Sequence, residues 1–227
     1  MDLAENIARI RAEMEQAAAG RPVQLLAATK TRTAEEVRQA IAAGVDVCGE
    51  NRVQELVEKS AQGAYEGAPV HFIGQLQKNK VKFVVGAVSL IHSVDSPELL
   101  ACIDRRACAL GLVQDVLLEV NIGHEATKGG VPPEALEPLL EQAASLHGIR
   151  VRGLMAIPPA AALCDGNRVY FARMHQLFVD IGRKKYDNVS MEILSMGMSD
   201  DFREAIAEGS NMIRIGSAIF GRRPDHK

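Results

Sequence analysis

Residues 23–44 read VQLLAATKTRTAEEVRQAIAAG, and this stretch is the most informative one for the fold. Val23 to Thr29 form a nearly continuous apolar run, which is typical of a parallel strand covered on both faces, and the run ends at Lys30. Thr33 and Glu36 then form a capping box, and residue 44 is a glycine where the C-terminal cap of a helix belongs. The stretch therefore predicts one strand-loop-helix unit.

The same alternation of strand and helix recurs along the rest of the chain. An extra helix precedes the first strand, because apolar residues recur at helical spacing until Gly20, at Leu3, Ile7, Ile10 and Met14. Further strands are predicted at 45–48, 70–73, 87–92, 113–120, 150–155, 189–194 and 212–215. Helices are predicted at 52–60, 96–111, 136–143, 171–181 and 200–208. Pro138 lies either in the first turn of its helix or at a kink.

Eight such units in 227 residues favour an α/β protein with a closed (β/α)8 TIM barrel and an extra N-terminal helix. We expect residues 1–227 to form a single domain. An open Rossmann-like sheet is the alternative fold, and the absence of a GxGxxG motif after the first strand weakens it.

Composition and charge exclude several classes of protein. The net charge of −3 gives no general attraction to nucleic acid or to an anionic membrane. The chain lacks a secretory signal and any apolar run near the ~20 residues of a membrane span, so we expect a cytoplasmic protein. Four cysteines without a CxxC pair and six histidines without HExxH spacing predict neither a disulfide scaffold nor a metal site. The basic cluster Lys78–Lys82 is interpreted as a solvated helix face.

Two glycine- and serine-containing segments follow the last two predicted strands, at 195–199 and 216–221. Barrels of this class commonly hold phosphate in these two loops, at the C-terminal ends of the strands. Gly216 would let the backbone approach an anion, and Ser199 and Ser217 would add hydroxyl donors. Loop chemistry and helix capping explain most single segments of this kind, but the position of these two favours a neutral phosphate site.

Lys30 directly follows the first strand, so its amine should reach the same end of the barrel. There it could form an imine with an aldehyde, if desolvation and a nearby cation such as Arg32 lowered its pKa. On spacing alone, however, an ordinary surface lysine is the more common outcome.

Two further residues carry alternatives that the sequence leaves open. Alternation in the last strand places Arg214 on the face opposite its isoleucine neighbours, at the barrel mouth. There it would form an ion pair with Glu119 or Glu192, or contact a ligand. Asn51, after the second strand, would either cap the next helix or contact a ligand.

Six segments of the chain resemble the YggS/PROSC family, also called pyridoxal phosphate homeostasis proteins, whose fold is similar to the barrel domain of alanine racemase. The order and spacing of the segments make the resemblance specific, and together they span almost the whole chain, at residues 28–30, 49–55, 71–80, 153–157, 195–201 and 214–221. Two departures are visible: Gln75 stands where many relatives carry histidine, and Ser217 replaces a common threonine.

The resemblance implies that pyridoxal 5′-phosphate (PLP) is the cofactor and that Lys30 holds it as a Schiff base. It also implies that Arg214 faces the pyridine nitrogen and that Asn51 lines the pocket. The remaining implied contacts are Ile73 and Met155 near the ring, and Ser199, Gly216 and Ser217 at the phosphate.

The same resemblance favours a PLP carrier over an enzyme. An arginine beside the pyridine nitrogen would weaken the ring as an electron sink, and the chain ends without the additional domain that gives alanine racemase its second acid/base. We expect a monomer that carries or buffers PLP in vitamin B6 homeostasis and protects it from stray amines by mass action, with PLP-dependent apoenzymes as candidate recipients. The alternatives are a PLP-dependent amino-acid racemase of low activity and a cofactor-free Schiff-base aldolase or lyase.

Overall fold

The computed structural model describes residues 2–159 and 166–221. Within these ranges, eight parallel strands follow one another in chain order around a closed barrel, and β8 lies beside β1. The strands are β1 Gln24–Ala28, β2 Val47–Glu50, β3 Val70–Phe72, β4 Leu90–Val94, β5 Gln114–Glu119, β6 Ile149–Met155, β7 Val189–Ser195 and β8 Met212–Ile215. The predicted (β/α)8 barrel is therefore confirmed, and the open Rossmann-like sheet is wrong.

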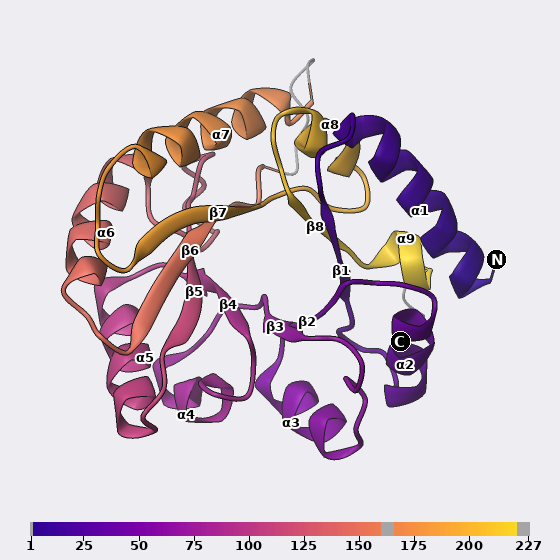
Figure 1. The fold of residues 1–227 in the computed structure, drawn as a ribbon, viewed down its shortest axis with the longest axis horizontal. Helices are drawn as coiled ribbons and strands as arrows, with labels where there is room; N and C mark the ends of the chain where they lie inside the picture. Colours follow the sequence, from indigo (N-terminus) through magenta and orange to yellow (C-terminus); the bar gives the residue numbers. More distant parts are fainter. Residues whose placement is uncertain (1, 160–165, 222–227) are drawn as a thin grey trace.

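The helices surround the barrel strands (Figure 1). They are α1 Leu3–Ala18, α2 Ala34–Ala42, α3 Val53–Ala61, α4 Val81–Val84, α5 Pro97–Ala109, α6 Leu136–Ala144, α7 Arg168–Gly182, α8 Phe202–Ala207 and α9 Ser217–Phe220, with 3-10 turns η1 Lys78–Lys80 and η2 Pro133–Ala135. The predicted extra helix, α1, packs against α8 and α9 (Figure 1). In the described part of the chain, no helix combines the length and the apolar character that crossing a bilayer requires.

Local signals near the first strand act as the sequence predicts. The Thr33 side chain accepts a hydrogen bond from the Glu36 N–H group at 3.2 Å, and the Glu36 carboxylate accepts one from the Thr33 N–H group at 2.7 Å. Gly44 follows α2 with a φ of +97°, a conformation that favours glycine. Pro138 lies in the first turn of α6, where its missing N–H group breaks no intrahelical bond, so it causes no kink.

Several predicted boundaries are wrong by two or three residues. Strand β4 begins at Leu90 and not at residue 87, because a turn through Gly86 is closed by a bridge between Val85 and Val88. Strand β2 begins at Val47 and not at residue 45. The basic cluster Lys78–Lys82 is divided between η1 and α4 and does not form one continuous helix.

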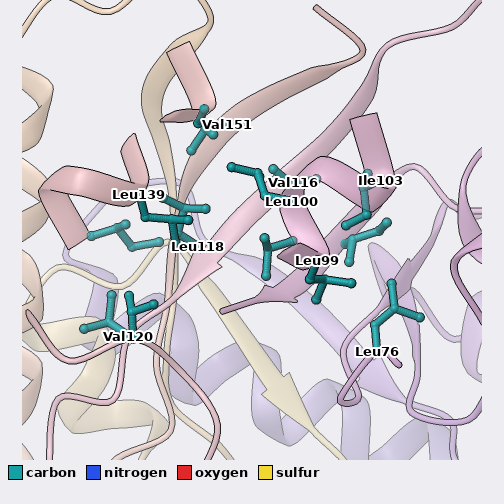
Figure 2. Packing of buried hydrophobic residues seen from close by; sticks show 14 of the residues in the cluster. Leu76, Leu99, Leu100, Ile103, Val116, Leu118, Val120, Leu139 and Val151 are labelled. Carbon is teal, nitrogen blue, oxygen red and sulfur yellow. The ribbon is translucent and has the colours of Figure 1, made fainter. Parts of the chain in front are cut away.

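The main core lies between the outer faces of the strands and the helices. Figure 2 shows part of it, where Leu118 of β5 and Leu139 of α6 lie close together within one buried cluster. Two smaller clusters fill the barrel interior, Leu26 with Val47 and Met212, and Leu90 with Leu117 and Met155. The barrel is thus packed along its axis, and ligand access is at the strand ends.

Candidate functional site

A cavity of about 240 Å³ opens at the C-terminal ends of β1 and β8. Three segments line it: the loop after β1, the loop after β7, and the stretch from β8 through α9. The cavity brings together five of the residues singled out from the sequence, Lys30, Ser199, Arg214, Gly216 and Ser217. The end of the first strand and the loops after the last two strands therefore share one pocket.

Asn51, Ile73 and Met155 do not line this cavity. Ile73 packs in the barrel interior beside Leu26, and Met155 is fully buried in the other interior cluster. The residue at the N-terminal cap of α3 is Arg52, with no side-chain cap bond, so the helix-cap interpretation of Asn51 is wrong. Among the described residues, the buried Oδ1 atom of Asn51 has no hydrogen-bond partner.

The hydrogen-bond pairing between β7 and β8 continues into the loop after β7, so this loop lies beside β8. The Met196 N–H group donates to the Met212 carbonyl at 3.2 Å, and the Arg214 N–H group donates to the Gly197 carbonyl at 3.0 Å. Further on, the Ala218 N–H group in α9 donates to the Ser199 hydroxyl at 3.3 Å. These bonds explain why the two loops meet at one place.

Gly197 in the first of these loops and Gly216 in the second have different structural roles. Gly197 has a φ of +95°, and a Cβ atom there would come within 2.6 Å of the Ala205 Cβ atom, so the fold itself requires glycine. Gly216 has a φ of −117°, and a Cβ atom there would meet only Ala28, at an ordinary 3.5 Å. The packing of the chain therefore does not explain the glycine at 216, which lines the open cavity.

Arg214 enters the barrel, while Ile213 and Ile215 pack outward against α1, as alternation predicts. Only 6% of Arg214 is exposed, and its guanidinium donates to the Ser195 hydroxyl at 2.7 Å and to the Ala156 carbonyl at 3.0 Å. The predicted ion pair is wrong: within residues 2–159 and 166–221, no carboxylate lies within 4 Å of this guanidinium, and Glu192 pairs with Arg152 instead.

Burial lowers the pKa of Arg214 to about 10, and Glu119 and Asp201 oppose that effect. The guanidinium therefore remains charged at neutral pH. Because it can only donate hydrogen bonds, its two partners fix its orientation at the inner end of the cavity.

A chain of buried hydrogen bonds extends from Arg214 across the barrel. The Ser195 hydroxyl lies 3.2 Å from His92 Nδ1, and His92 Nε2 lies 3.0 Å from His71 Nδ1. A neutral His92 has one donor and one acceptor nitrogen, so its two hydrogen bonds, to Ser195 and to His71, run in the same direction along this chain. Burial lowers the pKa of His71 to about 4 and that of His92 well below its usual value, so both rings are neutral at neutral pH.

Glu119, at the end of β5, is a titratable group that the sequence named only as a candidate ion-pair partner of Arg214. It is 8% exposed, and burial and the nearby Asp95 raise its pKa to about 7, while Arg214 opposes the shift. In the described ranges, no group of three or more His, Cys, Asp or Glu residues could hold a metal ion.

Comparison with known proteins places this architecture in a family. Residues 2–224 match the family described as alanine racemase, N-terminal domain. A pyridoxal phosphate homeostasis protein of Aquifex aeolicus is 43% identical over 98% of this chain and 99% of its own length. One of Pseudomonas aeruginosa is 41% identical over 97% of this chain and 96% of its own length.

A solved structure is similarly close. PipY of Synechococcus elongatus with PLP bound superposes with a TM-score of 0.86 at 34% identity, covering 97% of this chain and all of PipY. The fold, the near-complete coverage and the level of identity lead to one assignment: the chain belongs to the family of pyridoxal phosphate homeostasis proteins, within the alanine racemase N-terminal domain class.

Proposed function

We propose that this protein binds PLP through a Schiff base on Lys30 and carries or buffers it in vitamin B6 homeostasis. The observation that carries the proposal is the single cavity in which Lys30 shares a pocket with the loops after β7 and β8. The names of the relatives and the PLP-bound state of PipY support it.

The residues at the β7 and β8 side of the cavity fit a phosphate group. Ser199 and Ser217 supply hydroxyls at the cavity wall. In α9 the Ala218 N–H group donates to the Ser199 hydroxyl and the Ile219 N–H group to the Gly216 carbonyl, so the two serine hydroxyls are the donors that we assign to the anion. Gly216 leaves space that a side chain would fill. The chemistry matches a phosphate monoester, which needs several hydrogen-bond donors.

Lys30 is the lysine of the cavity wall, and it lies half-buried one residue beyond the fully buried Thr29. The aldehyde of PLP condenses with a primary amine to form a carbon–nitrogen double bond and release one water molecule. Attachment at Lys30 would anchor the aldehyde end of the ligand while the serine hydroxyls hold the phosphate end.

Arg214 suits a holder better than a catalyst. Its guanidinium stays charged and is fixed by Ser195 and Ala156, so it can donate to a ring nitrogen but cannot protonate it readily. A pyridine nitrogen that stays unprotonated weakens the electron-withdrawing power on which amino-acid chemistry depends. We propose that the bound ligand extends beyond the lining of this cavity to Asn51, and that Ile73 and Met155 support the ring from the barrel interior.

The proposal extends to the setting of the protein. It acts as a cytoplasmic monomer whose residues 1–227 form one domain, and PLP-dependent apoenzymes are the recipients of the bound PLP. Equilibrium binding protects the reactive aldehyde in proportion to the fraction bound.

The test is an absorbance titration of the purified protein with PLP. Wild-type protein is expected to develop a visible imine band that saturates with one PLP per chain, and Lys30→Ala is expected to lose the band. Lys78→Ala is the matched control, because Lys78 is an exposed lysine in η1, which follows β3 at the same end of the barrel as Lys30. A wild-type protein that never develops the band would refute the proposal and would leave the cofactor-free aldolase or lyase open.

The same preparation separates a carrier from a racemase. PLP-loaded protein incubated with single enantiomers of amino acids is expected to leave their optical purity unchanged. Sustained racemisation that is lost in Lys30→Ala would favour the racemase instead.

A further inference from the structure

A cluster of buried and half-buried polar side chains lies beside the end of β1, and its members do not line the cavity. We call Glu50, Glu55, Lys59 and Tyr65 the β1-end cluster. Lys59 is only 6% exposed and Glu50 is fully buried. The Lys59 ammonium donates to Glu50 Oε1 at 2.6 Å and to Glu55 Oε2 at 3.1 Å. The Tyr65 hydroxyl donates to Glu50 Oε1 at 3.0 Å.

The cluster is bonded directly to Thr29, the residue before Lys30. The Lys59 ammonium donates its third hydrogen bond to the Thr29 carbonyl at 2.7 Å. The Thr29 hydroxyl donates to Glu50 Oε1 at 2.6 Å. All three ammonium donors are thus used, and two of the partners are fully buried, so the carbonyl and the hydroxyl of Thr29 are both held.

The cluster also holds Thr31, the residue after Lys30. The Thr31 N–H group donates to Glu55 Oε2 at 2.6 Å. Thr31 has a φ of +63°, which is a genuine outlier for a residue with a branched Cβ atom. Such a conformation persists only where surrounding contacts enforce it. Glu55 Oε2 supplies that contact, and Lys59 holds the same oxygen.

Global stability does not explain this arrangement well, because a buried ion pair is often no more stabilising than well-packed apolar residues of the same volume. The cluster does have one geometric consequence: it fixes the backbone on both sides of Lys30. Lys30 itself lines the cavity that faces Ser199 and Gly216.

We propose that the β1-end cluster is a positioning device that fixes residues 29–31 so that the Lys30 amine faces the phosphate-binding loops at the distance imine formation requires. Glu55 is its adjustable member, because it links the Lys59 ammonium to the Thr31 backbone. The inference rests on the proposed function, and it assigns Glu50, Glu55 and Lys59 a role that acts through Lys30 and involves no contact with PLP.

The experiment compares two ligands, PLP and pyridoxine 5′-phosphate, which carries the same phosphate and ring but has no aldehyde. In Glu55→Ala, Thr31 loses its acceptor, while Lys59 keeps Glu50 and Thr29 as partners. The expected result is a PLP affinity about tenfold weaker, equivalent to about 1.4 kcal/mol, with pyridoxine 5′-phosphate affinity unchanged. In the ligand-free protein, hydrogen exchange at the Thr31 amide is expected to accelerate.

Two variants serve as controls. Glu58→Ala removes an exposed carboxylate from the same helix and should leave both affinities at the wild-type value. Glu55→Gln keeps an oxygen acceptor for the Thr31 N–H group, and its PLP affinity should be near the wild-type value. This variant keeps the inference testable if Glu55→Ala does not fold.

The outcomes separate the inference from the function beneath it. Equal weakening of both ligands in Glu55→Ala, or no weakening of either, would overturn the positioning role while wild-type binding of PLP still stands. A wild-type protein that binds pyridoxine 5′-phosphate and PLP equally, without an imine band, would overturn the proposed function together with this inference.

Discussion

Replacing Glu119 with glutamine should change the free energy of unfolding more favourably at alkaline pH than at acid pH. The Glu119 side chain is buried at the end of β5, near Asp95 and Arg214. Its pKa is raised from 4.5 to about 7, so the folded protein binds this proton more tightly than the unfolded chain does. The stability that proton binding at Glu119 contributes to the folded state is complete below about pH 4.5, and it is lost as the pH rises through about 7.

The size of the effect follows from the pKa difference. At about 1.4 kcal/mol per pKa unit, the difference between 4.5 and about 7 corresponds to roughly 3 kcal/mol. Most of this is lost between about pH 5 and about pH 8, because the unfolded carboxylate is already largely ionised at the lower value. The glutamine side chain does not titrate, so the variant should not lose this stability as the pH rises.

The measurement is urea unfolding of wild type and Glu119→Gln at both pH values. The free energy of unfolding of the variant, relative to wild type, is expected to be about 2 to 3 kcal/mol more favourable at about pH 8 than at about pH 5. Glu98→Gln, an exposed carboxylate on α5, is the control and should show no such difference. A pH-independent difference for Glu119→Gln would refute the assignment of a buried, proton-binding carboxyl group.

Three other substitutions test the loops and the hydrogen bonds around Arg214. Gly216→Ala should change the free energy of unfolding by less than about 0.5 kcal/mol but weaken PLP binding about tenfold, since its methyl group enters the cavity; unchanged PLP affinity in an absorbance titration would contradict this. Gly197→Ala should cost more than about 1 kcal/mol in urea unfolding because of its positive φ and the Ala205 contact, and wild-type stability would be the opposite result. Ser195→Ala should cost about 1 to 3 kcal/mol in the same assay, because Arg214 and His92 each lose a buried partner, and a variant as stable as wild type would show that these bonds are not needed.

The sequence predicts the barrel and the convergence of its last loops because those features depend on local, periodic signals. The apolar run before Lys30 places that lysine at a strand end, and alternation in β8 turns Arg214 inward. The capping box at Thr33 fixes where α2 begins. Each of these signals lies within a few residues of the feature it determines, which is why it can be found without coordinates.

The partners of the buried polar groups could not be predicted in the same way. The Arg214 guanidinium bonds to Ser195 and Ala156, residues that only the closed barrel brings near it. Lys59 did leave a signal, because it follows Val53 and Leu56 at spacings of three on the buried face of α3, where a lysine requires a partner. Its partner Glu50 lies on a neighbouring strand, and the pattern of the helix alone does not identify it.

The central claim is that PLP is attached to Lys30 within the cavity formed by the ends of β1, β7 and β8. Borohydride reduction of the PLP-loaded protein, followed by proteolysis and peptide mass mapping, tests this most directly. We predict that the reduced phosphopyridoxyl group is found on the peptide that contains Lys30. Its recovery on another lysine, or recovery of every peptide unmodified, would contradict the account.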